Sequence, residues 1–398
     1  MSDLLQRKRG RPKGSKNKPK GAAAMADLFG YSPSSAAITD SHTPTPCPGP
    51  TPAPSIFVVK GKPVPSPVFD TYWRFACERQ SLFFKKIRHP MQPPWTDDPV
   101  LLRHKFTNVY RASDRVSQYL ISNIINNTSE DLKDPSDIFF RILLFKIFNK
   151  IDTWEILEKD IGCIRWRDFD FARYDAILSR AIGAGKRIYS AAYIMPAPAF
   201  GCERKHSNHL RMLQRMLDDR LPERLFQQQD NLQNAYRCIL SYPGIGPFLA
   251  YQYSIDLNYS SILDASENDF VVPGPGALDG IKKCFLDIGE YTPADVIRFM
   301  CDQQELSFSR LNLPFMDLWG RKLHLIDCQN LFCEVDKYAR VVHPEFKGVS
   351  NRTRIKQIYR PNINSISYSY PTKWGLNGKI SNDPQYQMYD ERAQRENI

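Results

Sequence analysis

Two glycine turns and a nearby acidic residue form the pattern best suited to chemistry in this chain. Pro-Gly-Ile-Gly at 243–246 lies between two apolar helical patterns, and Pro-Gly-Pro-Gly at 273–276 opens another helix. Each turn exposes backbone N–H groups at a helix N-terminus, where phosphate oxygens bind well. Asp269 precedes the second turn and is a candidate catalytic acid or base. The candidate phosphate-binding residues are Gly244, Gly246, Gly274 and Gly276.

The first turn resembles a known DNA-binding motif. Leu240 to Ala250 is similar to the helix-hairpin-helix motif of DNA glycosylases, in which hairpin amides bind one DNA phosphate. An ordinary turn between two helices is the alternative. In those glycosylases an aspartate about 20 residues past the hairpin assists removal of a flipped base. Helix capping is the preferred role for Asp264, whereas Asp269 stays open between capping and chemistry.

A polar stripe is predicted on a helix over Val109–Ile125. Residues spaced i, i+3, i+4 and i+7 share one face of a helix. Two arginines on such a face bind a phosphate or a base edge, and an aspartate beside them orients one of them. A surface ion-pair network is the alternative. The stripe consists of Arg111, Asp114, Arg115 and Gln118.

A second polar face is predicted on a helix over Leu323–Tyr338. Acidic residues one or two turns apart suit a metal ion or acid–base work, but salt bridges along the helix are the preferred interpretation. The face consists of Asp327, Asn330, Glu334 and Lys337.

No metal site or nucleotide-binding loop is predicted. Gly183-Ala-Gly-Lys186 lacks the earlier glycine and the following Ser or Thr of a P-loop. The group Cys202, His206 and His209 has no fourth ligand, and basic neighbours would repel a cation. No cofactor follows from the sequence.

These candidates require a helical framework, and the apolar spacing predicts one mostly α-helical domain over about 68–347. The clearest strand pattern is Lys186–Tyr193. No apolar run approaches the roughly 20 residues of a membrane span, so no membrane partner is expected. Helices are predicted over Tyr72–Ile87, from about Thr96, and over Val109–Ile125, Ile138–Phe148, Trp154–Leu157, Phe171–Ala184, His209–Leu217, Leu232–Leu240, Ile281–Leu286, Pro293–Gln304 and Leu323–Tyr338.

The N-terminus predicts a tethered DNA-binding tail. Residues 1–20 carry +7 of the net charge of +11. Within them Arg9-Gly10-Arg11-Pro12 resembles an AT-hook, whose arginines enter the narrow minor groove of A·T-rich DNA. A nuclear-import signal or a solvated basic tail is the alternative, and the AT-hook and import interpretations indicate the nucleus. Residues 21–67 are rich in Pro, Ala and Ser and are expected to be a disordered linker. Residues 348–398 form a polar extension, either packed or disordered.

Five segments occurring in order resemble one family. That family is the helical domain of 5-hydroxymethyl-deoxyuridine (5-hmdU) DNA kinases, which is similar to the α-glutamyl/putrescinyl thymine pyrophosphorylases of hypermodified phage DNA. The resemblance covers about 68–347 and implies a glycosylase-like helical fold that acts on 5-hydroxymethylated pyrimidines in DNA. The segments are Tyr72–Phe75, Pro94–Asp97, residues 106–120, Asp269–Ala277 and Cys333–Tyr338.

The resemblance leaves three functional hypotheses open. As an enzyme, the chain would process a modified base, with Asp269 as acid or base and with Arg111 and Arg115 stabilising negative charge. As a reader, it would bind that base without turnover. As a scaffold, it would partner a separate kinase or a dioxygenase. Because the kinases use a P-loop domain and no P-loop match occurs here, kinase activity is not expected.

Overall fold

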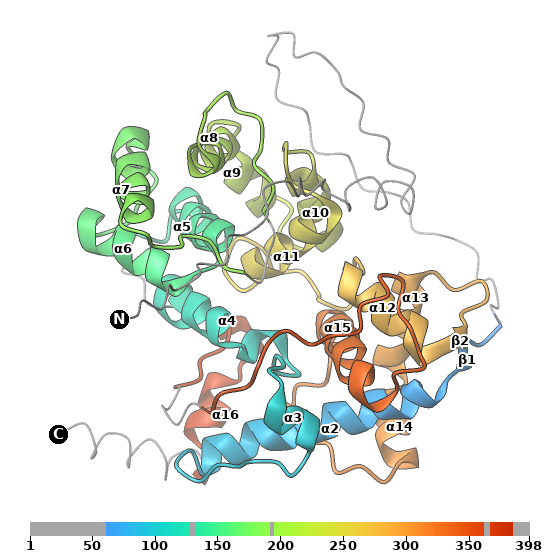
Figure 1. Cartoon of the computed structure of the whole chain (residues 1–398). Coiled ribbons are helices and arrows are strands. Elements are labelled where there is room, and N and C mark those ends of the chain that lie inside the picture. The colour runs from blue at the N-terminus through green and yellow to red at the C-terminus, as the bar shows by residue number, and fades with distance from the viewer. Residues whose placement is uncertain (1–60, 127–131, 192–194, 362–366, 385–398) are drawn as a thin grey trace, which may run out of the picture. The chain divides into compact units, whose positions relative to one another are not determined.

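The computed structural model describes residues 61–126, 132–191, 195–361 and 367–384. All of them belong to one compact unit, Pro46–Ile398. Helices dominate this part of the chain (Figure 1), which confirms the mostly helical prediction. The AT-hook-like residues 9–12 and the linker up to residue 60 lie outside the described residues. No helix among the described residues is long and apolar enough to cross a membrane.

Three mutually packed helices form one part of the core. The first begins after Ser66, whose Oγ accepts a hydrogen bond from the Val68 N–H at 3.1 Å, and it ends before His89 as predicted. The second and third approach closely at Gly280, because a Cβ there would lie 2.1 Å from the Phe332 carbonyl oxygen. The three helices are α2 (Pro67–Arg88), α12 (Pro275–Cys284) and α15 (Leu325–Val342).

Helix α5 (Pro135–Phe148) is the buried centre of a second group. Every side chain from Phe139 to Phe148 is buried, as its nearly continuous apolar sequence predicted. Its helices pack on α5 directly or on one another. The surrounding helices are α6 (Ile151–Ile161), α7 (Phe171–Gly183), α8 (Lys205–Asp218), α9 (Leu221–Phe226), α10 (Leu232–Leu240) and α11 (Pro247–Leu257).

The predicted helix over Val109–Ile125 is broken, so that prediction was wrong. The segment divides into a 3-10 turn η1 (Arg111–Ser113), α4 (Arg115–Tyr119) and a π-helix η2 (Leu120–Asn126). Asp114 has extended backbone angles between the first two, and its carboxylate accepts a hydrogen bond from the Asn108 N–H at 2.8 Å. This local bond stabilises a turn in place of a continuous helix.

The strand prediction over Lys186–Tyr193 was also wrong, since residues 186–191 form no strand. The Ile188 carbonyl accepts a hydrogen bond from Thr153 Oγ1, and the Ser190 N–H donates to the Phe148 carbonyl, so this segment bonds to helix ends. Among the described residues, the strands are an antiparallel pair, β1 (Val64–Pro65) and β2 (Phe285–Asp287).

Helix α3 (Pro99–Arg103) is capped by Asp98, one residue beyond the predicted Thr96 or Asp97. The Asp98 carboxylate accepts hydrogen bonds from the N–H groups of Val100 and Leu101 at 2.7 and 3.0 Å. The remaining elements are α13 (Pro293–Asp302), α14 (Gln304–Arg310), η4 (Thr372–Trp374) and α16 (Asn377–Ser381).

The described parts of the C-terminal extension pack against the helices. Tyr370 is fully buried, and Trp319 Nε1 donates to Asp383 Oδ2 at 2.9 Å. Farther upstream, the Tyr359 N–H donates to the Arg103 carbonyl at the end of α3. Of the two alternatives for this extension, the packed one therefore applies to 348–361 and 367–384.

Candidate functional site: a basic cavity and its carboxylates

The polar face of α15 binds the segment that precedes η1. Glu334 Oε2 accepts a hydrogen bond from the Thr107 N–H at 3.0 Å, and Asp327 Oδ1 accepts one from the Arg111 N–H at 3.0 Å. Between them, Asn330 Nδ2 donates to Thr107 Oγ1 at 3.2 Å. This face therefore packs against a neighbouring segment and fixes its path. Among the described residues, no group of three or more His, Cys, Asp or Glu residues could bind a metal ion.

Arg111 lies in the interior and bonds to α11. One Nη lies 2.8 Å from Asp256 Oδ1, Nε donates to Gln252 Oε1 at 2.9 Å, and the other Nη donates to the Tyr259 hydroxyl at 3.1 Å. Lys146 of α5 approaches the same Asp256 carboxylate at 3.3 Å, and burial lowers the pKa of Lys146 to about 8. In this arrangement Arg111 joins η1 to α5 and α11.

Asp114 and Arg115 do not join Arg111 at one face. Burial raises the pKa of Asp114 to about 6, although its hydrogen bond from Asn108 opposes the shift. Arg115 is exposed at the start of α4. Because Arg111 is buried and Arg115 is exposed on the other side of the turn at Asp114, the predicted pair of phosphate-binding arginines does not form.

Glu267, which the sequence patterns did not single out, is the buried carboxylate of the 264–269 loop. It is 3% exposed, whereas Asp264 and Asp269 on either side are exposed. Glu267 Oε2 lies 2.6 Å from an Arg321 Nη and 3.9 Å from His324 Nδ1. Burial raises the pKa of Glu267 despite the opposing charge of Arg321.

Two buried polar atoms of this pair have no hydrogen-bond partner among the described residues, namely Glu267 Oε1 and Arg321 Nε. An unsatisfied buried polar atom costs about 1–3 kcal/mol, so each one in a folded protein calls for an explanation. Of the two residues, Arg321 lines the neighbouring cavity, so a group that enters there would contact its guanidinium. This is the strongest local indication of a ligand.

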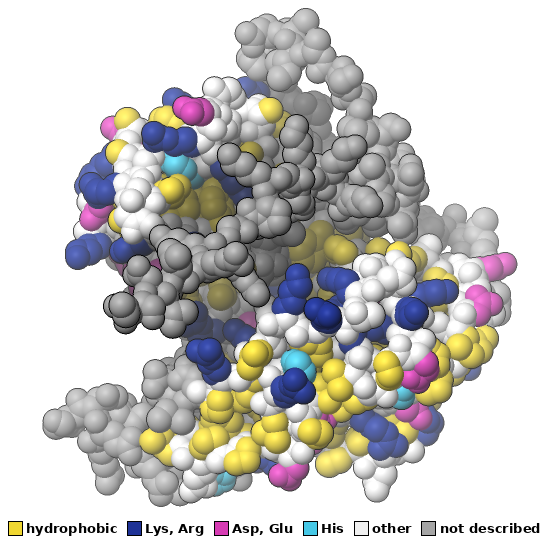
Figure 2. All heavy atoms as spheres, in the orientation of Figure 1, with side chains coloured by type: hydrophobic (Ala, Val, Ile, Leu, Met, Phe, Trp, Pro, Cys, Tyr) yellow, Lys and Arg dark blue, Asp and Glu magenta, His cyan; other side chains and the backbone are white. Residues whose placement is uncertain are grey.

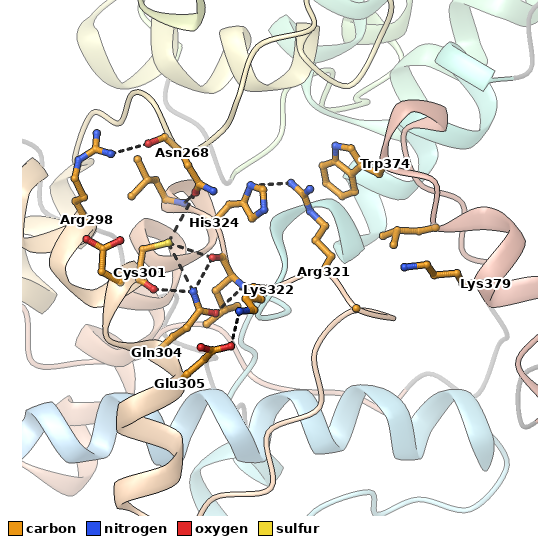
Figure 3. Close-up of a pocket in the computed structure, with 15 residues that line it drawn as sticks. Asn268, Arg298, Cys301, Gln304, Glu305, Arg321, Lys322, His324, Trp374 and Lys379 are labelled. Carbon is orange, nitrogen blue, oxygen red and sulfur yellow. Dashed lines mark hydrogen bonds and ion pairs between the residues drawn. The ribbon is translucent and has the colours of Figure 1, made fainter. Parts of the chain in front are cut away.

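A cavity of about 590 Å³ lies next to this pair and is shown in Figure 3. Its size falls within the range of small-molecule sites. Arg321 forms part of the wall, and its guanidinium lies 3.6 Å from the ring centroid of Trp374. Basic side chains outnumber acidic ones in the lining, so the cavity favours an anionic group. The charged residues that line it are Arg298, Arg321, Lys322 and Lys379 against Asp302 and Glu305.

A second titratable carboxylate, Asp327, lies behind this wall. Its Oδ2 accepts a hydrogen bond from the His324 N–H at 3.2 Å. Burial and then the charge of Glu267 raise the pKa of Asp327 to about 7, while burial and Arg321 lower the pKa of His324 to about 4. A carboxyl with a pKa raised in this way is suited to acid–base chemistry, although Asp327 is buried and does not itself line the cavity.

The two glycine turns lie side by side, and they differ in exposure. Gly274 begins α12, and a Cβ there would lie 2.7 Å from the ring of Phe248 at the start of α11. Gly276 packs on α15, with a Cβ position 3.0 Å from Cys333 Sγ. Gly244 and Gly246 are exposed between α10 and α11. Close packing thus explains Gly274 and Gly276. It also applies to Gly244, which has a φ of 80° and a Cβ position 2.9 Å from Pro198 Cβ, whereas Gly246 meets open space.

Comparison with known proteins adds the family. Residues 66–348 match the family described as "5-hmdU DNA kinase, helical domain". The chain belongs to this family. It is also 25% identical over 333 residues to a 5-hmdU DNA kinase of Bacillus phage SP10, an alignment that covers 79% of this chain and 50% of that protein. The chain thus spans about half the length of this curated relative. No solved structure matches.

The 5-hmdU DNA kinase helical domain contains most of the site. Glu267, Arg321 and Asp327 lie inside the matched residues, whereas Trp374 and Lys379 come from the extension beyond residue 348. Asp269 also lies within the match, but its side chain is exposed, and Arg298 donates to its backbone carbonyl at 3.1 Å. Asp269 does not cap α12, because the N-cap of that helix is Gly274. A catalytic role for Asp269 stays a prediction.

Proposed function

We propose that this chain recognises or processes a 5-hydroxymethylated pyrimidine of DNA at the basic cavity. The family indicates the substrate class. The observation that carries the proposal is the Arg321–Glu267 pair, since it puts an incompletely bonded cation and a buried carboxylate beside a cavity large enough for a base. Charged groups in a buried site stabilise charge that develops on a substrate more strongly than they would in water.

The chemistry of the substituent fits these side chains. A 5-hydroxymethyl group presents a hydroxyl that donates one hydrogen bond and accepts others. Arg321 is the donor for that oxygen, or for a phosphate attached to it, because a guanidinium binds phosphate in a fork geometry. Asp327, with a pKa near 7, is the group that takes up or releases a proton. Asp269 is retained as the alternative acid or base.

DNA binding by the rest of the chain completes the proposal. A base must leave the duplex to enter a cavity, as in enzymes that flip their target nucleotide. The exposed Gly244–Gly246 turn would bind a neighbouring phosphate in the manner of a helix-hairpin-helix motif. The AT-hook-like residues 9–12 would add minor-groove binding to A·T-rich DNA in a nucleus.

One experiment separates an enzyme from a reader. The full chain is incubated with duplexes containing 5-hydroxymethyluracil, 5-hydroxymethylcytosine or thymine, with and without ATP, and the nucleosides are analysed by mass spectrometry. A new product from the hydroxymethylated duplex indicates an enzyme, and selective binding without a product indicates a reader. The ATP arm tests the expectation that this chain is not itself a kinase.

Matched variants assign the result to a residue. Glu267→Gln preserves shape and removes charge, Asp269→Asn does the same at the exposed position, and Glu290→Gln is a control at an exposed site. We expect Glu267→Gln to abolish product or selectivity and Glu290→Gln to have no effect. Loss in Asp269→Asn with full function in Glu267→Gln would move the site away from the cavity.

A further inference from the structure

An extended basic segment, residues 347–361, crosses the surface in front of α15 and α3 (Figure 1). From residue 352 on, basic residues occupy positions 352, 354, 356 and 360, with Ile358 at the remaining alternate position, and this stretch contains no acidic residue. In an extended chain, alternate residues point to the same side. Figure 2 shows Lys and Arg side chains gathered across the middle of this face. The alternating basic residues are Arg352, Arg354, Lys356 and Arg360.

The backbone of the basic segment is fixed by hydrogen bonds. The Gln357 carbonyl accepts a bond from the Lys105 N–H at 3.1 Å, and the Tyr359 N–H donates to the Arg103 carbonyl at 3.0 Å. Ile355 and Tyr359 pack against the core between the basic positions. Because these residues point inward, the alternate basic side chains are directed outward, and all of them are exposed.

Most of these cations lack a neutralising partner. Arg352 pairs with Asp279 at 2.6 Å. Within the described ranges, Arg354, Lys356 and Arg360 form no ion pair. A row of unpaired like charges creates a positive potential that attracts an anionic partner. The same charges repel one another, which destabilises the folded segment. Nothing in the packing of the segment requires these three charges.

We propose that the basic segment binds the phosphate backbone of DNA through a row of cations on one side of the chain. Alternate residues of an extended chain lie about 6.6 Å apart, so Arg352 to Arg360 span about 26 Å. DNA is a linear polyanion with about one charge per 1.7 Å of duplex axis, and a straight row of cations matches such a partner. Trp374, which lies farther along the sequence, is part of the cavity wall. This inference deepens the proposed function by placing its substrate on a defined surface.

The phosphate contacts predict a measurable salt dependence. Each neutralised phosphate contributes about −0.9 to the slope of log K against log salt concentration. Arg354→Gln/Lys356→Gln/Arg360→Gln in the full chain should therefore reduce the slope by about 2.7. It should also weaken binding at 0.15 M salt by about 100-fold if all three contacts are complete. Because phosphate contacts carry no sequence information, 5-hydroxymethyluracil and thymine duplexes should be affected equally.

A matched variant controls for overall charge. Lys159→Gln/Lys186→Gln/Arg187→Gln removes the same charge from exposed positions on α6 and just after α7. Fluorescence anisotropy on both duplexes between 50 and 200 mM salt gives the slopes for each protein. The proposal expects the control to retain the slope of the parent chain. Equal slopes for the two triple variants would overturn it.

Two further measurements keep the result interpretable. Arg354→Lys/Arg360→Lys preserves charge and should retain the slope, which separates charge from packing. Thermal unfolding of each variant shows whether the fold is intact. If the segment variant loses slope while neither duplex is preferred by the parent chain, the segment is supported and the proposed function fails. If the preference persists and the slope is unchanged, only the segment proposal fails.

Discussion

Arg111 is expected to stabilise the fold, and Arg111→Met tests this. The change leaves Asp256, which has no exposed surface, without its arginine. Removing one partner of a buried ion pair typically costs 3–5 kcal/mol. Because Lys146 remains 3.3 Å from the same carboxylate, we expect the lower end, about 3 kcal/mol. With a urea m value of about 3 kcal/mol/M, the unfolding midpoint should fall by about 1 M.

The assay is urea unfolding followed by circular dichroism, with Arg115→Met as the matched control. Arg115 is exposed, and a surface substitution of this kind changes stability by no more than about 0.5 kcal/mol. The reasoning would be refuted if Arg111→Met kept the parent midpoint and still lost processing or selective binding of 5-hydroxymethylated DNA. That result would restore the role in charge stabilisation that its spacing suggested.

Three other predictions concern packing, pH and the tail. Gly280→Ala should destabilise the chain by about 2–3 kcal/mol, because the added Cβ clashes with Phe332. The control Gly183→Ala meets open space and should leave stability unchanged. Equal urea-unfolding midpoints for the two variants would contradict this. Asp327 binds its proton more tightly in the folded state, so the free energy of unfolding should fall between about pH 4 and 7, by up to about 1.4 kcal/mol per pH unit. In Asp327→Asn the urea-unfolding midpoint should depend less on pH over this range. Removing residues 1–20 should lower A·T-rich duplex affinity and the salt slope in anisotropy titrations; unchanged values would exclude the AT-hook.

Helices with a continuous apolar pattern were predictable from the sequence. The apolar run of α5 predicted Ile138–Phe148, and the observed Pro135–Phe148 begins three residues earlier, at the Asp134 cap. Leu232–Leu240 was predicted with both ends correct. In these segments local apolar spacing and tertiary packing favour the same structure.

The predictions failed where a side chain bonds to the backbone. Asp114 accepts the Asn108 N–H and ends a helical pattern that spacing alone extends to Ile125. Similarly, the Ile281–Leu286 helix prediction missed that Phe285 begins β2, where pairing with β1 outweighs helical spacing. The Asp114 bond is local, but apolar spacing does not register it. The β1–β2 pairing joins segments distant in sequence, so a local pattern does not contain it.

The sequence patterns singled out the loop beside the candidate cavity and Asp327, but they did not single out Glu267 or Arg321. The 264–269 loop was chosen by its distance from the glycine turn, and it does supply a buried carboxylate. That residue is Glu267. Its burial is compensated by Arg321, which lies more than fifty positions later in the sequence and pairs with it. The candidates Asp264 and Asp269 were judged by residue type, and burial is a property that residue type does not reveal. Arg111 and Asp327 were singled out on two separate polar faces. The hydrogen bond from the Arg111 N–H to Asp327 shows that these two faces meet.

The most direct test of the cavity as the functional site compares Glu267→Gln with Glu290→Gln on duplexes containing 5-hydroxymethyluracil or thymine. Mass spectrometry of the nucleosides and anisotropy of the complexes are measured on the same samples. We expect the parent chain and Glu290→Gln to convert the hydroxymethylated duplex or bind it selectively, and we expect Glu267→Gln to do neither while unfolding near the parent midpoint. Undiminished conversion or selectivity in a folded Glu267→Gln would contradict a functional role for this cavity.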